Sequence, residues 1–331
     1  MTGWPTGVAT GVGSMPGTLP REAAALVVGE LPELPHLVEL PERGPGADLI
    51  GRGAAMLVDL HVDLQPSGWR LVDRAGLDER RALSWLDEDL DALEEAAEGW
   101  TGPLKMQVAG PWTLAAQVEL PRGDKALADS GAARDIAGSL AAAVAAHVAE
   151  VRKRVPDAQL LVQLDEPSLP AVLTGTVKRA SGWGRLEPVE AHVVEQLLTA
   201  VVQAAGVPVG VYCCAADVSV GLLRRAGASM VGLDAALLTD RDEDGLGEAI
   251  EGGTVLGFGL VPTRGDLSDP AGTVLPLRRL GERLGLSAEV LARSVLVTPG
   301  CGLAGASPGH AREILARTRD AARRLVEDAQ D

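Results

Sequence analysis

Two cysteines and an aspartate lie where apolar runs of the chain end, and side chains of these types can bind a metal ion together. Cys214, Cys301 and Asp234 each follow a short apolar run of strand length. Thiolates suit zinc, whereas Mg²⁺ and Ca²⁺ prefer oxygen ligands. Two thiolates and a carboxylate can hold Zn²⁺ with an open fourth position, which is the arrangement of a catalytic zinc site. The spacing is weakly specific, because the sequence contains no C-x-x-C pair.

Structural roles compete with this interpretation. Free cysteine is among the most buried residue types, so core packing is sufficient to explain Cys213. If a strand continues through Cys213 and Cys214, their side chains point to opposite faces and do not serve one site. Serine and aspartate after a strand are also common as turn residues or helix caps. That role stays open for Ser14, Asp165 and Asp234.

The elements that position these residues alternate regularly along the chain. Strand-like runs are followed by helix-like runs; the predicted strands cover 8–12, 36–40, 105–109, 159–164, 207–211, 230–233, 254–260 and 294–298. Regular alternation predicts parallel strands with right-handed crossovers. We therefore expect an α/β fold, a single (β/α)8 TIM barrel, as one catalytic domain over residues 1–331. A doubly wound open sheet is the alternative.

A barrel makes the positions of the polar residues testable. Active sites of such barrels lie at the carboxyl ends of the strands. Six candidate residues fall at or just past the end of a predicted strand: Ser14, Gly110, Asp165, Cys214, Asp234 and Cys301. We therefore expect these residues on one face of the barrel.

The composition excludes several classes of function. A net charge of −16 argues against nucleic-acid binding, which needs clustered Lys and Arg. Three cysteines in 331 residues do not make a disulfide framework, so we expect a cytoplasmic protein. The most apolar long segment, 132–151, carries four ionisable side chains and predicts a packed helix rather than a membrane span. The sequence gives no indication of the oligomeric state.

Six segments resemble the catalytic barrel of cobalamin-independent methionine synthase. They are GVGSMPGT, VAGPWTLA, QLDEPSLP, the strand before Cys214, the strand that ends in Asp234, and PGCGL. They occur in the order found in that family and extend from Gly11 to Leu303. The related uroporphyrinogen decarboxylases, of the same superfamily, share a segment like GPWTLA, whereas QLDEP together with PGCGL is more specific.

The resemblance implies a zinc-dependent methyltransferase of methionine biosynthesis. Its substrates would be a homocysteine-like thiol and a methyl donor of the methyltetrahydrofolate type. The family binds zinc through a His-x-Cys pair, a glutamate and a cysteine in a CGL segment. These positions correspond to Cys214, Asp234 and Cys301, while Tyr212 stands at the position of the histidine. The resemblance leaves three options: Cys213 replaces the histidine, the site has three ligands, or zinc binding is weak or absent.

The resemblance also implies residues that bind the substrates. Ser14 would hold the carboxylate of the amino acid, and Asp165 its ammonium group. Trp112 would stack on a flat methyl donor, although tryptophan in a GPW turn is also common as a packing residue. No catalytic proton donor is assigned, because the family's His-Ser-Pro segment and its glutamate-bearing segment have no recognisable counterpart. His310 is the histidine that lies nearest to Cys301 in the sequence.

Two other kinds of function remain compatible with the sequence. One is a superfamily relative that acts on another thiol, or a metal-free enzyme of the decarboxylase type. The other is a non-catalytic barrel that binds a small ligand, which the departure at Tyr212 keeps open.

Overall fold

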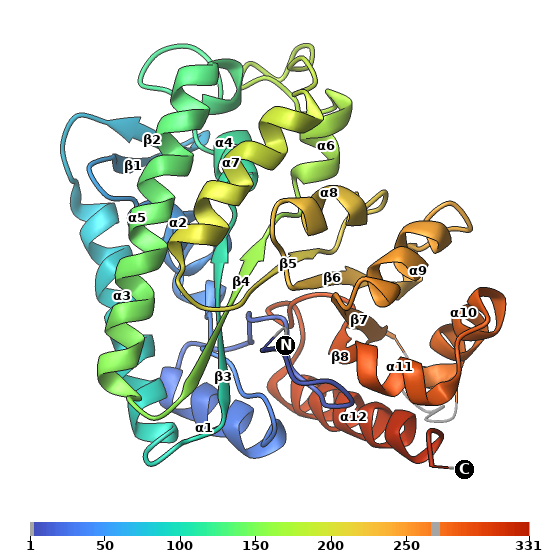
Figure 1. Ribbon diagram of the computed structural model, residues 1–331. Helices are drawn as coiled ribbons and strands as arrows, with labels where there is room; N and C mark the ends of the chain where they lie inside the picture. Colours follow the sequence, from blue (N-terminus) through green and yellow to red (C-terminus); the bar gives the residue numbers. More distant parts are fainter. Residues whose placement is uncertain (1–2, 266–271, 331) are drawn as a thin grey trace.

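The computed structural model describes residues 3–265 and 272–330 and has an α/β fold around a curled parallel sheet (Figure 1). Six strands pair in chain order, and every neighbouring pair is parallel. The strands are β3 (Pro103–Ala109), β4 (Gln159–Asp165), β5 (Val209–Cys213), β6 (Met230–Asp234), β7 (Val255–Val261) and β8 (Val295–Pro299). These six strands confirm the last six of the predicted runs.

Helices cover the outer side of the curled sheet (Figure 1). They are α1 (Pro20–Glu30), α2 (Leu49–Ala55), α3 (Leu77–Ala96), α4 (Pro111–Gln117), α5 (Ser130–Arg154), α6 (Leu169–Thr174), α7 (Ala191–Ala204), α8 (Val220–Arg225), α9 (Glu243–Glu251), α10 (Leu275–Leu284), α11 (Ala288–Ser294) and α12 (Pro308–Glu327). The strands are buried along most of their length, and β7 is buried along all of it. β3 and β4 also carry buried polar side chains, namely Lys105, Gln107, Gln163 and Asp165.

The first two predicted strands are wrong in detail. Segments 8–12 and 36–40 form no regular strand, and their backbone makes isolated parallel bridges, namely Ala9 to Val297, Ser14 to Glu39, and His36 to Lys105. These bridges connect β8 to the first segment, the first segment to the second, and the second to β3. Glycine weakens a strand, and proline lacks the N–H that a ladder needs. Gly11 lies within the first segment, and Pro35 and Pro41 flank the second.

Buried side chains hold the backbone of these two segments in place of a full ladder. Lys105 Nζ donates to the carbonyl of Val12 at 2.8 Å, and Gln163 Nε2 donates to the same oxygen at 2.9 Å. Gln107 Nε2 donates to the carbonyl of Leu37 at 2.9 Å. The polar residues inside the sheet therefore satisfy main-chain groups that would otherwise be buried without partners.

The segment 60–72, whose pattern is mixed, forms an antiparallel hairpin of β1 (His61–Gln65) and β2 (Gly68–Val72). Its Trp69 is buried against α2, where a Cβ atom at Gly51 would lie 2.8 Å from the indole ring. The hairpin thus forms a separate two-stranded sheet that packs against α2 and α3.

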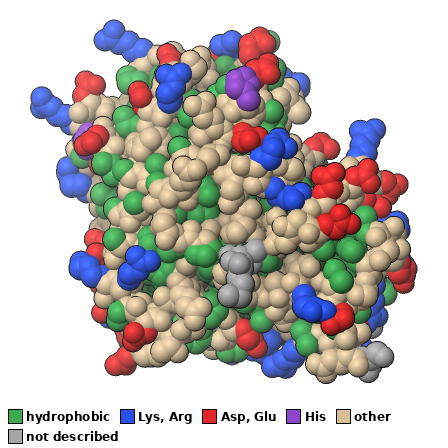
Figure 2. Space-filling view, viewed as in Figure 1, with side chains coloured by type: hydrophobic (Ala, Val, Ile, Leu, Met, Phe, Trp, Pro, Cys, Tyr) green, Lys and Arg blue, Asp and Glu red, His purple; other side chains and the backbone are tan. Residues whose placement is uncertain are grey.

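Charged side chains are scattered over the outer surface in small groups (Figure 2). Figure 2 shows acidic side chains gathered over α9, which carries Glu243, Asp244, Glu248 and Glu251. Within residues 3–265 and 272–330, no helix is both long enough and apolar enough to cross a membrane.

His147 provides a test of the packing of α5. Burial lowers its pKa from 6.5 to about 3. The unfolded chain binds this proton near pH 6.5 but the folded chain does not, so stability is lost as the pH falls below 6.5. For His147→Gln we expect the loss of unfolding free energy between pH 7 and pH 5 to be smaller than the parent's by about 2 kcal/mol.

Urea unfolding of the parent and the variant at both pH values measures this difference. His192→Gln is the matched control, because His192 is exposed, and it should keep the parent's pH dependence. Equal losses in the parent and in His147→Gln would contradict a buried, neutral His147.

Candidate functional site

A cavity of about 280 Å³ lies at the carboxyl ends of the strands and gathers most of the predicted residues. Its ionisable and hydroxyl-bearing lining residues are Ser14, Glu39, Asp48, Asp165, Tyr212, Cys214 and Cys301. Ser14, Asp165, Cys214 and Cys301 were predicted from the sequence. The predicted residues Trp112 and Asp234 do not line this cavity.

The two thiols that line the cavity are in direct contact. Cys214 follows β5 and Cys301 follows β8, yet their Sγ atoms lie 3.1 Å apart, within hydrogen-bonding distance. The hydrogen bond between the two thiols lowers the pKa of the Cys301 thiol to about 7, whereas this bond and burial raise the pKa of the Cys214 thiol. Cys213 is fully buried on the other side of β5, as the alternation of a strand predicts, and burial raises its pKa to about 12.

Two buried carboxyl groups share the cavity with these thiols. Asp165 Oδ1 accepts from Gln163 Nε2 at 2.7 Å, and Glu39 Oε1 accepts from Gln107 Nε2 at 3.2 Å. Burial raises the pKa of Glu39, and it raises the pKa of Asp165 well above its usual range. Lys105 is fully buried beside both, and burial lowers its pKa to about 8. A nearby cation would therefore stabilise the ionised forms of these two carboxyl groups.

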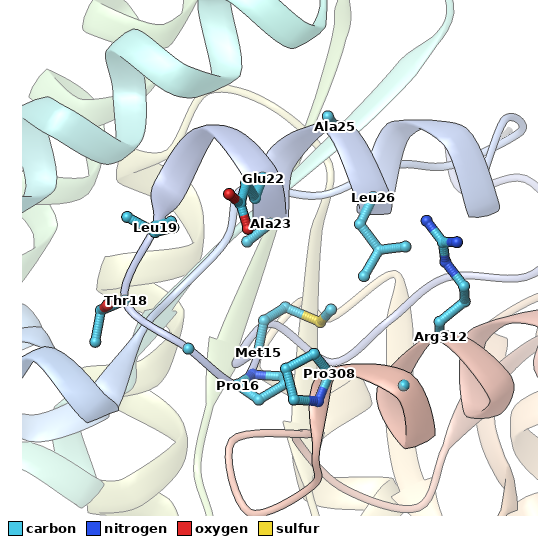
Figure 3. Close-up of a pocket in the computed structure, with 12 residues that line it drawn as sticks. Met15, Pro16, Thr18, Leu19, Glu22, Ala23, Ala25, Leu26, Pro308 and Arg312 are labelled. Atoms are coloured by element: carbon cyan, nitrogen blue, oxygen red, sulfur yellow. The ribbon is translucent and has the colours of Figure 1, made fainter.

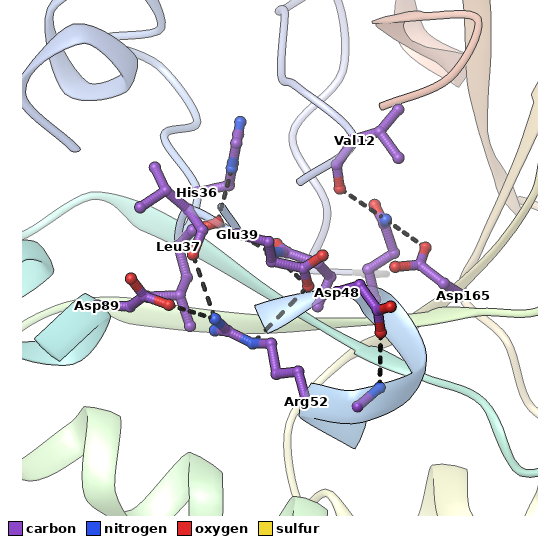
Figure 4. Close-up of polar contacts among 12 residues, drawn as sticks. Val12, His36, Leu37, Glu39, Asp48, Arg52, Asp89 and Asp165 are labelled. Carbon is purple, nitrogen blue, oxygen red and sulfur yellow. Dashed lines mark hydrogen bonds and ion pairs between the residues drawn. The ribbon is translucent and has the colours of Figure 1, made fainter. Parts of the chain in front are cut away.

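A buried ion-pair cluster lies behind Glu39 (Figure 4). Arg52 Nε is 3.9 Å from Glu39 Oε1, and Arg52 Nη1 donates to Asp89 Oδ2 at 2.6 Å. Asp89 also accepts from Arg43 Nη2 at 2.6 Å. The charge of Arg52 is thus shared between two carboxylates, and its position restrains Glu39 at the edge of the cavity.

Ser14 is positioned by close contact with the loop that carries Cys301. A Cβ atom at Gly302 would lie 2.1 Å from Ser14 Oγ, so only glycine permits this approach. Leu303 N donates to the carbonyl of Ser14 at 2.8 Å. The GVGS and PGCGL motifs are therefore in contact in the fold.

The side chain of Trp112 packs in the core of the structure. Its side chain is buried, and its indole Nε1 donates to the carbonyl of Val194 in α7 at 3.1 Å. Glu166 accepts the backbone N–H groups of Trp112 and Thr113 at 2.9 and 2.7 Å, which caps the start of α4. Burial raises the pKa of Glu166 to about 7. A Cβ atom at Gly110 would lie 2.3 Å from Glu166 Oε1, so the GPW and DEP motifs form one structural contact.

Asp234 and Tyr212 lie next to the loop of Cys301. Asp234 Oδ1 accepts from Ala236 N at 3.0 Å, and a Cβ atom at Gly300 would lie 2.9 Å from that oxygen. The Tyr212 hydroxyl donates to the carbonyl of Gly300 at 2.8 Å. Asp234 therefore lies beside the loop of Cys301, although it does not line the cavity.

As a metal site, this arrangement is incomplete. Two thiols converge, but the described parts of the chain hold no group of three or more His, Cys, Asp or Glu side chains placed to bind a metal ion. Tyr212 stands where the family has histidine, and its hydroxyl is engaged with main-chain carbonyls. Cys213 does not reach the cavity, so it offers no replacement ligand.

Sequence reasoning missed Glu39 and Asp48 and gave weight to His310. Glu39 lies at the end of the predicted run 36–40, so the rule that found Asp165 would have found it too. Asp48 caps α2 by accepting from Gly51 N at 2.7 Å. His310 lies in the first turn of α12 with Nδ1 3.4 Å from Glu313 Oε2, and it does not line the cavity.

A larger hollow of about 750 Å³ lies between α1 and the start of α12 (Figure 3). Its charged side chains are Glu22 and Arg312, and its other lining residues include Met15, Leu26 and Pro308. It contains no thiol and no buried ionisable side chain. The smaller cavity is therefore the candidate active site.

Comparisons with known proteins show the family of the chain. Residues 4–324 match the model of the family described as cobalamin-independent synthase, catalytic domain. Among solved structures, a B12-independent methionine synthase from Shewanella sp. W3-18-1 in complex with selenomethionine has a similar fold, with a TM-score of 0.64. That likeness covers 98% of this chain and 99% of the other, at 11% sequence identity. No curated protein matches the chain.

The match to the family model spans nearly the whole chain. Four of the segments that resemble the family place a residue at one cavity, namely Ser14, Asp165, Cys214 and Cys301. The chain belongs to the cobalamin-independent synthase catalytic-domain family and is a methyltransferase, which confirms the resemblance found in the sequence.

The hydroxyl of Tyr212 gives a second test. Tyr212→Phe removes the donor to the buried carbonyls of Pro299 and Gly300, and we expect the unfolding free energy to fall by about 1–3 kcal/mol. Urea denaturation at pH 7 measures the loss. A change below about 0.5 kcal/mol, the range of an ordinary surface substitution, would contradict the contact.

Proposed function

We propose that the chain transfers a methyl group from a methyltetrahydrofolate-type donor to the thiol of an amino acid, most simply homocysteine to give methionine. The observation that carries this proposal is the lining of one small cavity, where Cys214 and Cys301 share the space with the buried carboxyl groups of Glu39 and Asp165. Such a cavity offers an acidic region for an ammonium group and a sulfur-rich region for a thiol.

The amino-acid part of the substrate would contact the buried residues. Asp165 and Glu39 would bind the ammonium group, whose positive charge favours their ionised forms despite burial. The Ser14 hydroxyl would bind the carboxylate, as the resemblance implies. Trp112 is left out of the proposed donor site, because its indole is engaged with Val194 and does not reach the cavity.

We propose that the metal of this family is zinc here too, held by Cys214 and Cys301 with Asp234 as the third ligand. The thiol contact and the position of Asp234 against Gly300 support this assignment. A bound zinc ion would favour the thiolate of the substrate at neutral pH, and the thiolate is the nucleophile. The residues proposed to bind the amino-acid part of the substrate, Ser14, Glu39 and Asp165, would orient that thiol toward the methyl group.

We also propose that the chain forms one eight-stranded catalytic barrel that works in the cytoplasm. The bridged segments 8–14 and 36–39 would supply the first two barrel positions between β8 and β3. This arrangement would place Ser14 and Glu39 at the same face as the ends of the six regular strands.

Asp165→Asn tests the ammonium site. Loss of a charged hydrogen-bond partner should weaken homocysteine binding about 10- to 100-fold, because such bonds contribute about 1.5–3 kcal/mol. Isothermal titration calorimetry on the parent and the variant measures the change. Asp73→Asn is the control, since Asp73 is exposed and remote from the cavity lining. An unchanged Kd in a folded Asp165→Asn protein would contradict the assignment.

Tyr212→His tests the metal proposal. If Cys214, Cys301 and Asp234 hold zinc, an imidazole at position 212 should add a ligand and slow the loss of zinc to a chelator. Elemental analysis should find about one zinc per chain in the parent, and much less in Cys214→Ser and Cys301→Ser. A parent that stays free of zinc after incubation with the metal would instead favour the metal-free relative.

A further inference from the structure

The contact between Cys214 and Cys301 has a geometry that suits the formation of a disulfide bond. Their Sγ atoms are 3.1 Å apart, and a disulfide bond measures about 2.05 Å, so closure needs an approach of roughly 1 Å. Neither cysteine lies inside a regular strand, since β5 ends at Cys213 and β8 ends at Pro299. Backbone at the ends of strands can make this adjustment without breaking a ladder.

Both sulfur atoms are also accessible to a small oxidant. Cys214 and Cys301 are partly exposed and line the cavity, whereas Cys213 is fully buried and lies outside it. Gly300 and Gly302 flank Cys301, so no bulky side chain adjoins it in the chain. Cys213, which precedes Cys214 at the end of β5, therefore serves as an internal control.

We propose that Cys214 and Cys301 form a reversible intramolecular disulfide when a peroxide reaches the cavity. One thiolate attacks the peroxide, so that an S–O bond forms, the O–O bond breaks and hydroxide leaves as water. The sulfur of the second cysteine then attacks the sulfenic acid and displaces its oxygen as a second water. Overall, two thiols lose two electrons and two protons, and one hydrogen peroxide is reduced to two waters.

The disulfide would join the end of β5 to the loop after β8, across 87 positions of the sequence. Both thiols of the cavity would be consumed at once, so neither would remain to bind a metal ion. The inference rests on the position of the two sulfur atoms and not on the proposed methyl transfer, and the two can fail separately.

Peroxide treatment of the purified full-length chain, with and without added zinc, tests the proposal. The reduced protein has three cysteines, and oxidation should lower its mass by about 2 Da and leave one alkylatable thiol after denaturation. Peptide mapping should show the peptides of Cys214 and Cys301 linked and Cys213 alkylated. Dithiothreitol should restore all three thiols, and bound zinc should slow the oxidation.

The variants separate this disulfide from other oxidation products. Cys213→Ser should still lose both remaining thiols, whereas Cys214→Ser and Cys301→Ser should not form the internal link. A link between Cys213 and Cys214, a link between two chains, or oxidation to sulfinic acid with no internal disulfide would each overturn the proposal. Methyl-transfer activity is not the readout, so an inactive protein that forms the link would still support it.

Discussion

The carbonyl oxygen of Val12 links the backbone of the first segment to the buried polar side chains of the sheet. The segment around it lacks a regular ladder, and two buried side chains, Lys105 and Gln163, donate to that single oxygen. A buried ammonium group without partners would cost several kcal/mol, so Lys105 requires both this carbonyl and the nearby carboxyl groups. The backbone of the first segment and the charges of the cavity therefore depend on each other.

This dependence explains why the candidate site is built from both polar and sulfur-containing residues. Gln163 binds the Val12 carbonyl and Asp165 with the same amide nitrogen, so the residue that secures the backbone also orients a cavity carboxyl group. On the neighbouring strand β5, Tyr212 holds the carbonyl of Gly300 and so restrains the loop of Cys301. The acidic region and the thiol pair are thus fixed by separate contacts within one lining.

The sequence predicted the six regular strands and four residues of the cavity lining, Ser14, Asp165, Cys214 and Cys301. Runs such as 159–164 and 254–260 are rich in apolar residues and followed by helices, so their strands could be found from pattern alone. The segments 8–12 and 36–40 also contain several apolar residues, but distant side chains hold their backbone, and a local pattern does not contain those contacts. Glu39 lies at the end of the run 36–40, so the strand-end rule could have found it, but its contacts with Gln107 and Arg52 from elsewhere in the chain are not contained in a local pattern. Trp112 shows the converse, since its motif matches the family while its side chain packs against α7.

The central claim is that one cavity recognises both the ammonium group and the thiol of an amino acid. Calorimetric titration of the parent protein with L-homocysteine and with 4-mercaptobutanoate, which lacks only the amino group, tests it most directly. A site that holds the ammonium group between buried carboxyl groups should bind homocysteine more tightly by a factor of about 10 or more, because the analogue leaves those groups unpaired. Equal affinity for the two compounds would contradict the account, and the acidic residues of the cavity would then have a structural role only.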